Sequence, residues 1–183
     1  PDDAVMASPA EVRAVRDWAL EAFTGVRPGA ERPVKIEVRR QDHSVLRFGR
    51  SCIDTPMRIG SKPFRRGLGT HANSVIGVGV PPNAKTFRAM VGIDNNEDTQ
   101  GVRGTVQFSV EIGGKEVLRT PTLKGGQEPV PVEVPILPGT REIVLKVDTT
   151  PDGPAHDQSD WADARLTLDD GTILWLDEGE QAF

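Results

Sequence analysis

The chain has 183 residues, a formal net charge of −5 at pH 7, 27% charged residues and 37% hydrophobic residues. This composition is typical of one well-packed globular domain with or without a small appendage, and it does not favour a disordered chain. The acidic balance leaves no basic footprint, so the sequence predicts no nucleic-acid partner. No apolar run is long enough to cross a bilayer, so we also predict no membrane span.

The first segment has the pattern of a helix. Ser8 is a good N-cap, Pro9 suits the first helical position, Glu11 completes a capping box, and Gly25 can end the helix. A proline- and glycine-containing linker follows. The sequence therefore predicts an N-terminal helix and linker over residues 1–33, ahead of a separate domain over residues 34–183.

From residue 34 onward the hydrophobic period changes to two. The clearest case is residues 104–120, where four apolar positions alternate up to Gly113–Gly114, the dipeptide typical of a hairpin turn. A second hairpin is predicted at the Asp–Gly pair of residues 170–171. About nine or ten short strands are expected, with many turns because the chain has 19 glycines and 15 prolines. The pattern predicts an antiparallel β-sandwich.

The chain has one cysteine, Cys52, which rules out an internal disulfide framework. Free cysteines behave as small apolar side chains, and this interpretation of Cys52 in "RSCID" is favoured over that of a nucleophile. We therefore expect Cys52 to fill space in a strand.

Polar residues concentrate in three loops, each next to a predicted strand: "GLGTHANS" at 67–74, "GIDNNEDTQG" at 92–101 and "VDTTPDGPAHDQSDWADA" at 147–164. Their positions make it possible for all three to meet at one edge of the sandwich. An enzymatic interpretation would need two carboxylates across a scissile glycosidic bond, chosen from Asp94, Glu97, Asp157 and Asp160. The sequence cannot give their separation, and no nucleophile elbow or phosphate loop is present. We expect no catalytic activity.

Calcium is a second possibility for these loops. The oxygen-rich stretch "VDTTPDG" places Asp148 and Asp152 near backbone carbonyls and a glycine, and hard cations prefer such oxygen ligands. The stretch does not match an EF-hand loop. Aspartates in such turns also cap backbone N–H groups, and the sequence leaves these two interpretations of Asp148 and Asp152 open.

A sugar site would use an aromatic plane beside fixed hydrogen-bonding groups. Trp161 has Asp157 and Asp160 nearby, and His71 can donate or accept through either ring nitrogen. The alternative for Trp161 is an ordinary core aromatic at the start of the last long strand.

Several stretches resemble one known family. "IGSKPFRRGLGTHANSVIGVGVP", "FRAMVGID", "GTVQFSVEIGGKEVL" and "DQSDWADARL" are similar, in order and spacing, to the NPCBM family, which is carbohydrate-binding module family 51. The resemblance covers most of the chain, from about Lys35 to Leu168. It implies a jelly-roll β-sandwich without catalytic activity. Matched to the family's motifs, the carbohydrate-binding residues would be His71, Asp94, Asp157, Asp160 and Trp161.

The resemblance also implies a function. Members of the family are appended to secreted bacterial glycoside hydrolases or peptidases, and characterised members bind galactose-containing glycans. We therefore expect a non-catalytic module that binds terminal galactose-type glycans, with a catalytic domain of the same polypeptide as its partner. Its expected location is secreted, periplasmic or on a bacterial cell surface. The alternative is a structural or protein-interaction sandwich that binds no sugar, in which the family motifs support the fold.

Overall fold

The computed structural model describes residues 15, 19, 22 and 34–182. Contacts divide the chain into residues 1–32 and residues 33–183, and the second unit is the one described below. The helix and linker expected over residues 1–33 lie outside the described residues, apart from Val15, Ala19 and Ala22. That part of the expected domain organisation stays a prediction.

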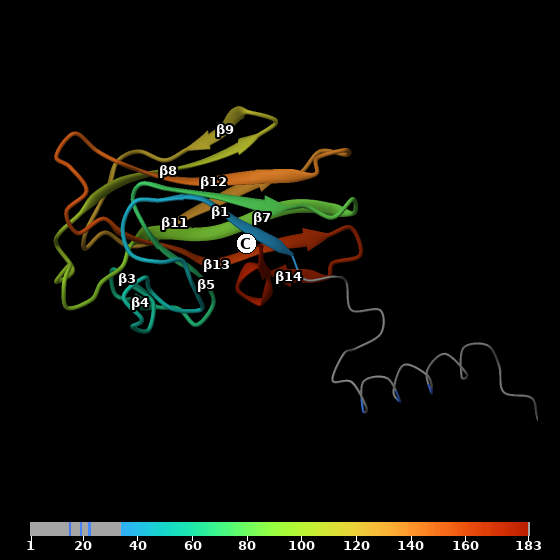
Figure 1. Cartoon of the computed structure of the whole chain (residues 1–183), viewed down its shortest axis with the longest axis horizontal. Coiled ribbons are helices and arrows are strands. Elements are labelled where there is room, and N and C mark those ends of the chain that lie inside the picture. Colours follow the sequence, from blue (N-terminus) through green and yellow to red (C-terminus); the bar gives the residue numbers. More distant parts are fainter. Residues whose placement is uncertain (1–14, 16–18, 20–21, 23–33, 183) are drawn as a thin grey trace, which may run out of the picture. The chain divides into compact units, whose positions relative to one another are not determined.

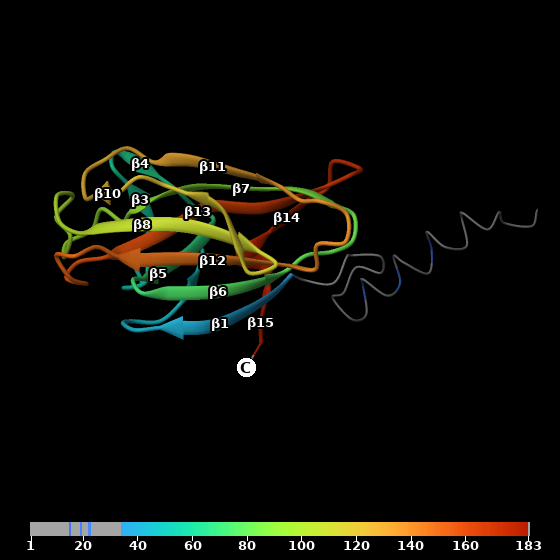
Figure 2. The same cartoon turned by 90° about the horizontal axis from the view of Figure 1, so that it is seen from above.

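Residues 34–182 form a β-sandwich of two mainly antiparallel sheets (Figures 1 and 2). Sheet A has the order β10 (Leu123–Lys124), β8 (Thr105–Ile112), β12 (Glu142–Thr149), β6 (Ser74–Gly79), β1 (Lys35–Gln41) and β15 (Glu180–Ala182), with β9 (Lys115–Arg119) paired to β8. Sheet B has the order β11 (Val130–Pro135), β7 (Ala84–Ile93), β13 (Gln158–Leu168), β5 (Gly67–His71) and β2 (Arg47–Phe48), with β14 (Ile173–Trp175) paired to β13. The predicted β-sandwich is confirmed.

The alternating patterns explain the longest strands. In β12, every second residue from Ile143 to Val147 is buried, and the residues between them are half-buried. The hairpin predicted at Gly113–Gly114 joins β8 to β9, and both glycines have positive φ angles, 57° and 75°. Such angles are required at both centres of a type I′ turn, and only glycine adopts them without strain. The turn at residues 169–172 likewise joins β13 to β14.

Two features differ from the sequence-based expectation. There are fifteen strands among the described residues instead of nine or ten, because six of them have only two or three residues and carry no readable period. Cys52 is buried, as expected, but it lies in a turn and not in a strand. One pairing, between β1 and β15, is parallel and brings the C-terminal segment back to the edge of sheet A.

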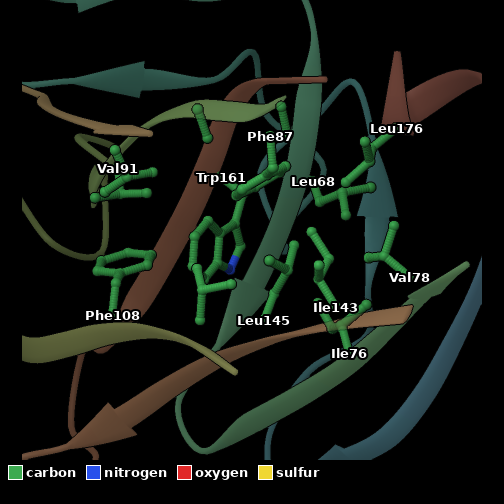
Figure 3. Close-up of a cluster of buried hydrophobic side chains, with 14 of the residues drawn as sticks. Leu68, Ile76, Val78, Phe87, Val91, Phe108, Ile143, Leu145, Trp161 and Leu176 are labelled. Atoms are coloured by element: carbon green, nitrogen blue, oxygen red, sulfur yellow. The ribbon is translucent and has the colours of Figure 1, made fainter. Parts of the chain in front are cut away.

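The core lies between the two sheets and centres on Trp161. The indole ring meets Phe108 edge-on, with ring centroids 5.0 Å apart, and Phe87 at 6.1 Å. Figure 3 shows the ring surrounded by aliphatic side chains from both sheets, including Leu68 and Leu145. Aromatic pairs of this geometry add to the stabilisation that burial of apolar surface already provides.

A second, smaller core covers part of the outer face of sheet B. Residues 49–66, which we call the strap, include β3 (Arg58–Ile59) and β4 (Lys62–Pro63) and run beneath β5 and β13 (Figure 1). Met57 and Ile59 of the strap pack on Ala162 of β13. A Cβ atom at Gly69 would collide with the backbone of the strap, and one at Gly92 would collide with Ile59. These glycines therefore permit the close approach of the strap.

The three polar loops lie at one end of the sandwich. The β5–β6 turn and the loops that follow β7 and β12 gather at the left of Figures 1 and 2, with the β1–β2 loop beside them. This is the arrangement that the sequence made possible. Within residues 34–182 there is no helix long and apolar enough to span a membrane.

Candidate functional site

Trp161 does not line the surface. Its exposed fraction is 0%, and its ring lies between the two sheets (Figure 3). The expectation that Trp161 offers a stacking plane to a sugar is therefore wrong, because the alternation of β13 turns this side chain into the core. The other interpretation, an ordinary core aromatic, is the one that the structure supports.

Asp160 and Asp94 form a buried pair on the outer face of sheet B, under the strap. Both have an exposed fraction of 0%. The Asp94 carboxylate accepts hydrogen bonds from Arg58 N at 2.9 Å and from Asn96 Nδ2 at 2.6 Å. Burial and the neighbouring charge of Asp94 raise the pKa of Asp160 well above its ordinary value. Because both side chains are fully buried, neither residue can reach a ligand in solution.

Asp157 also serves the fold. Its side chain accepts hydrogen bonds from Thr105 N at 2.9 Å and from Thr149 Oγ1 at 2.7 Å, and it is fully buried. These bonds fasten the loop after β12 to the start of β8 and the end of β12. Burial raises the pKa of Asp157, while the bond from Thr149 opposes that shift. The expected sugar contacts from Asp94, Asp157 and Asp160 are therefore corrected to structural hydrogen bonds and burial.

Of the five expected site residues, only His71 reaches the surface. It is half-buried at the end of β5, and its Nδ1 lies 2.8 Å from the carbonyl oxygen of Ala72. A carbonyl only accepts, so Nδ1 donates the proton of this bond. In the neutral ring Nε2 is then an acceptor. The exposed ring of His43 meets His71 edge-on, with centroids 5.2 Å apart.

Further polar groups continue from His71 along the same end of sheet B. Gln158 is the β-sheet partner of His71, and its side-chain amide donates to Asp98 Oδ2. His156 Nδ1 lies 3.0 Å from the same oxygen. The Asp98 side chain is 47% exposed and that of His156 is 33% exposed. We call His43, His71, Asp98, His156 and Gln158 the polar rim.

The polar rim holds groups that sequence reasoning missed. His43, Asp98 and Gln158 received no role, although Asp98 lies in one of the polar loops and Gln158 lies within the "DQSDWADARL" motif. His156 was noticed only as part of a polar loop. A usable signal was the strand pairing: "GTHA" and "DQSD" lie on adjacent strands, and in the observed register Gln158 lies opposite His71.

The expected metal ligands do not form a cluster. Asp148 lies 3.8 Å from Arg119 Nη2, and Asp152 accepts a hydrogen bond from Thr105 Oγ1 at 2.6 Å. Among the residues that the structure describes, no group of three or more His, Cys, Asp or Glu side chains could hold a metal ion. The hydrogen bonds to Asp152 match the other interpretation, an aspartate that fixes a turn. Calcium binding stays an untested prediction.

The arrangement offers no catalytic pair among the four acids considered. A glycosidase places its two carboxyl groups on either side of an open cleft, about 5–10 Å apart. Here Asp94 and Asp160 are electrostatic neighbours beneath the strap, and Asp157 accepts hydrogen bonds from Thr105 N and Thr149 Oγ1. All three are buried. Only Glu97 is exposed. What remains accessible is a set of neutral and anionic hydrogen-bonding groups that can hold a polar ligand.

A fold of this kind with an accessible polar rim is that of a ligand-binding module. Residues 32–167 match the model of the "NPCBM/NEW2 domain" family, which is three quarters of the chain. The chain belongs to this family. It is accordingly a carbohydrate-binding module and not a catalytic domain, and the resemblance stated from its motifs is confirmed.

Three relatives illustrate the match. The chain is 32% identical over 127 residues to "Alpha-1,3-galactosidase B" of Akkermansia muciniphila, a match that covers 68% of this chain and 16% of the enzyme. It is 25% identical to the structure of CBM51-2 in complex with GlcNAc and INT domains from Clostridium perfringens ZmpB, with a TM-score of 0.64, covering 70% of this chain and 29% of that one. CBM51 from Clostridium perfringens GH95, solved in complex with methyl-galactose, is 23% identical, with a TM-score of 0.65; the match covers 70% of this chain and 91% of that one. This last likeness shows the fold alone.

Proposed function

We propose that this module binds the terminal galactose-type unit of a glycan at the polar rim. The observation that carries the proposal is the exposure pattern at the end of sheet B: the motif acids and Trp161 are buried, whereas His71, His43, Asp98 and His156 reach solvent side by side. The rim lies at the loop end of the sandwich, on the part of the chain that matches the family.

The rim has the chemistry that a sugar needs. Each sugar hydroxyl can donate one hydrogen bond and accept others, so a site must provide fixed partners of both kinds. The neutral ring of His71 offers Nε2 as an acceptor, held in place by the bond from Nδ1 to Ala72 O. Asp98 offers a carboxylate that His156 and Gln158 orient through its Oδ2. The exposed imidazole of His43 supplies a small flat surface next to the polar groups.

The sugar class follows from the relatives. The Akkermansia muciniphila relative is a galactosidase, and a module that keeps an enzyme at its substrate binds the same kind of glycan that the enzyme cleaves. The ZmpB relative was solved with GlcNAc, so N-acetylglucosamine is the competing monosaccharide. A site that buries so few atoms binds one sugar weakly, with a dissociation constant of about ten micromolar to a millimolar.

The proposed setting is a larger enzyme. The chain spans 16% of the galactosidase and 29% of the ZmpB chain that it matches. We infer that a catalytic domain of the same polypeptide is the partner of this module and that the protein acts outside the cytoplasm, where glycans are found. Tethering raises the local concentration of that catalytic domain at the substrate without any new contact.

The test is a panel of immobilised glycans that end in galactose, N-acetylgalactosamine, N-acetylglucosamine or glucose. The purified module is applied with calcium and again with a chelator, after circular dichroism has established that it is folded. Retention on galactose-type ends supports the proposal, and loss of retention with the chelator would make calcium part of the binding. A blank panel from folded protein would contradict it and favour the structural alternative.

A further inference from the structure

A second polar surface lies on sheet B, away from the rim. Four residues stand opposite one another across β11, β7, β13 and β14: Glu133, Arg88, Arg165 and Trp175. Residues before and after them on β11, β7 and β13 are buried in the main core, so these side chains lie on the outer face of the sheet. The strap covers only the Trp175 end of this row, where the guanidinium of Arg66 lies over the indole ring, 4.8 Å from its centroid. The apolar contacts of the strap are to Ala162 and Met90.

This row borders a cavity of about 460 Å³. Its lining combines charged and apolar side chains: Arg88, Ala89, Met90, Pro131, Val132, Glu133, Asp163 and Arg165. Trp175 adds an aromatic ring at one side, because the Arg165 guanidinium lies over that ring, 5.6 Å from its centroid. The ring is only half-buried. We call Arg88, Met90, Glu133, Asp163, Arg165 and Trp175 the trough.

The charges of the trough are held in fixed positions. Arg88 donates to both carboxylate oxygens of Glu133, at 2.8 and 3.1 Å, so these two side chains neutralise each other. Arg165 donates from Nη1 to the backbone oxygen of Asp163 at 2.8 Å. Within residues 34–182, neither the guanidinium of Arg165 nor the carboxylate of Asp163 has a salt-bridge partner within 4.0 Å. The trough therefore presents the remaining N–H donors of the Arg165 guanidinium and the carboxylate oxygens of Asp163.

This combination suits a neutral polyhydroxyl ligand. A free anion would meet the carboxylates of Glu133 and Asp163, and a free cation would meet Arg88 and Arg165. Adjacent sugar hydroxyls, in contrast, can accept from a guanidinium and donate to a carboxylate at the same time. The apolar face of a pyranose can then rest on Met90 and Pro131, which line the cavity.

We propose that the trough is a second carbohydrate site, which takes a neutral hexopyranose independently of the polar rim. The proposal rests on the function of the module as a sugar binder, but not on the rim as the place of binding. Gln158 of the rim and Arg165 of the trough are seven residues apart on β13, which corresponds to about 23 Å along a strand. One monosaccharide cannot reach both, whereas two branches of one glycan can, and two weak sites then add their effects through tethering.

Amide chemical shifts of the isotope-labelled module test this directly. The probes are methyl α-D-galactopyranoside, N-acetyllactosamine and the anionic trisaccharide 3′-sialyllactose. We expect the neutral probes to shift two separate sets of amides, one around His71 and Asp98 and one around Arg88, Met90 and Arg165. Arg165→Met, which keeps the apolar stem on Trp175, should weaken binding at the second set at least about fivefold, the loss expected for a charged hydrogen-bond donor, and leave the first set unchanged.

Matched variants separate the outcomes. Asp163→Asn removes the acceptor charge at a position with φ of 49°, which asparagine tolerates, and should act like Arg165→Met. Arg119→Met removes an exposed arginine on sheet A and should change neither set. If amides at the trough shift and those at the rim do not, the result contradicts sugar binding at the rim and supports sugar binding at the trough. Three results would contradict binding at the trough. The shifts could be confined to the rim, folded protein could show no shifts, or it could respond only to 3′-sialyllactose in a way that salt abolishes.

Discussion

The carboxyl group of Asp160 lies fully buried near the carboxylate of Asp94, and burial together with that neighbouring charge raises the pKa of Asp160 well above its ordinary value. Within the described residues, neither oxygen of Asp160 has a hydrogen-bond partner. Gly69 and Gly92 are the neighbours of Asp160 on the two adjacent strands, and the strap fills the space that their missing side chains leave. Asp160, the first acid of the "DWADA" motif, is therefore a buried structural residue between sheet B and the strap.

This pairing predicts how Asp160→Asn changes stability. The folded pKa of Asp160 is raised, so its contribution is fully present below about pH 3.9, the ordinary pKa of the unfolded chain, and is lost as pH rises toward the folded pKa. Asparagine carries no charge at any pH, so it does not titrate beside Asp94. We expect the melting temperature of Asp160→Asn, relative to wild type, to rise between pH 4 and pH 8. Thermal unfolding over that range checks this against Glu97→Gln, an exposed control. A difference in melting temperature that stays constant from pH 4 to pH 8 would contradict the raised pKa of Asp160.

Trp161 should be needed for stability and not for sugar binding. Trp161→Ala leaves a large cavity between the sheets and should cost about 3–5 kcal/mol. Trp161→Phe keeps part of the packing against Phe108 and Phe87, and the indole N–H has no described hydrogen-bond partner to lose, so its cost should be smaller. Urea unfolding gives both values. Equal stability of wild type and Trp161→Ala would refute the core role.

The strap makes a prediction about three strand glycines. Gly69→Ala would drive a methyl group into the backbone of Arg50 and Ser51, which cannot move aside, and should cost about 1–3 kcal/mol. Gly92→Ala meets the side chain of Ile59, which can adjust, so its cost should be lower. Gly79→Ala is the matched control, because its nearest contact, Lys35 Cβ, would be at 3.5 Å. The measurement is the order of the three losses in unfolding free energy. If Gly79→Ala loses as much as Gly69→Ala, the result contradicts the close approach of the strap to β5.

Cys52 should be inert in the folded module. Burial raises the pKa of its thiol to about 12, and the residue is 2% exposed. Since the thiolate is the reactive form, a disulfide reagent at pH 8 should modify Cys52 slowly in buffer and rapidly in urea. Equal rates in the two solutions would mean that the turn around Cys52 opens readily.

The sequence predicted the β-sandwich, the two hairpins and the meeting of the polar loops, because hydrophobic alternation and turn glycines are local signals. It did not predict the side of the sheet on which each motif residue lies. Trp161 and Asp160 are adjacent on β13 and point to opposite faces, yet both are covered, one by sheet A and the other by the strap. Nothing local to "DWADA" reveals a covering segment a hundred residues earlier. For the same reason Asp98 was missed: its bond partners lie 58 and 60 residues away.

The most direct test compares two conservative variants on immobilised galactose. His71→Gln alters the half-buried surface residue of the rim, and Trp161→Phe alters the buried residue of the neighbouring motif. We expect His71→Gln to be retained more weakly on the galactose resin, with only the trough left to bind, while unfolding at nearly the wild-type temperature. Trp161→Phe should keep wild-type retention while unfolding at a lower temperature. Wild-type retention by His71→Gln together with weaker retention of folded Trp161→Phe would contradict the account.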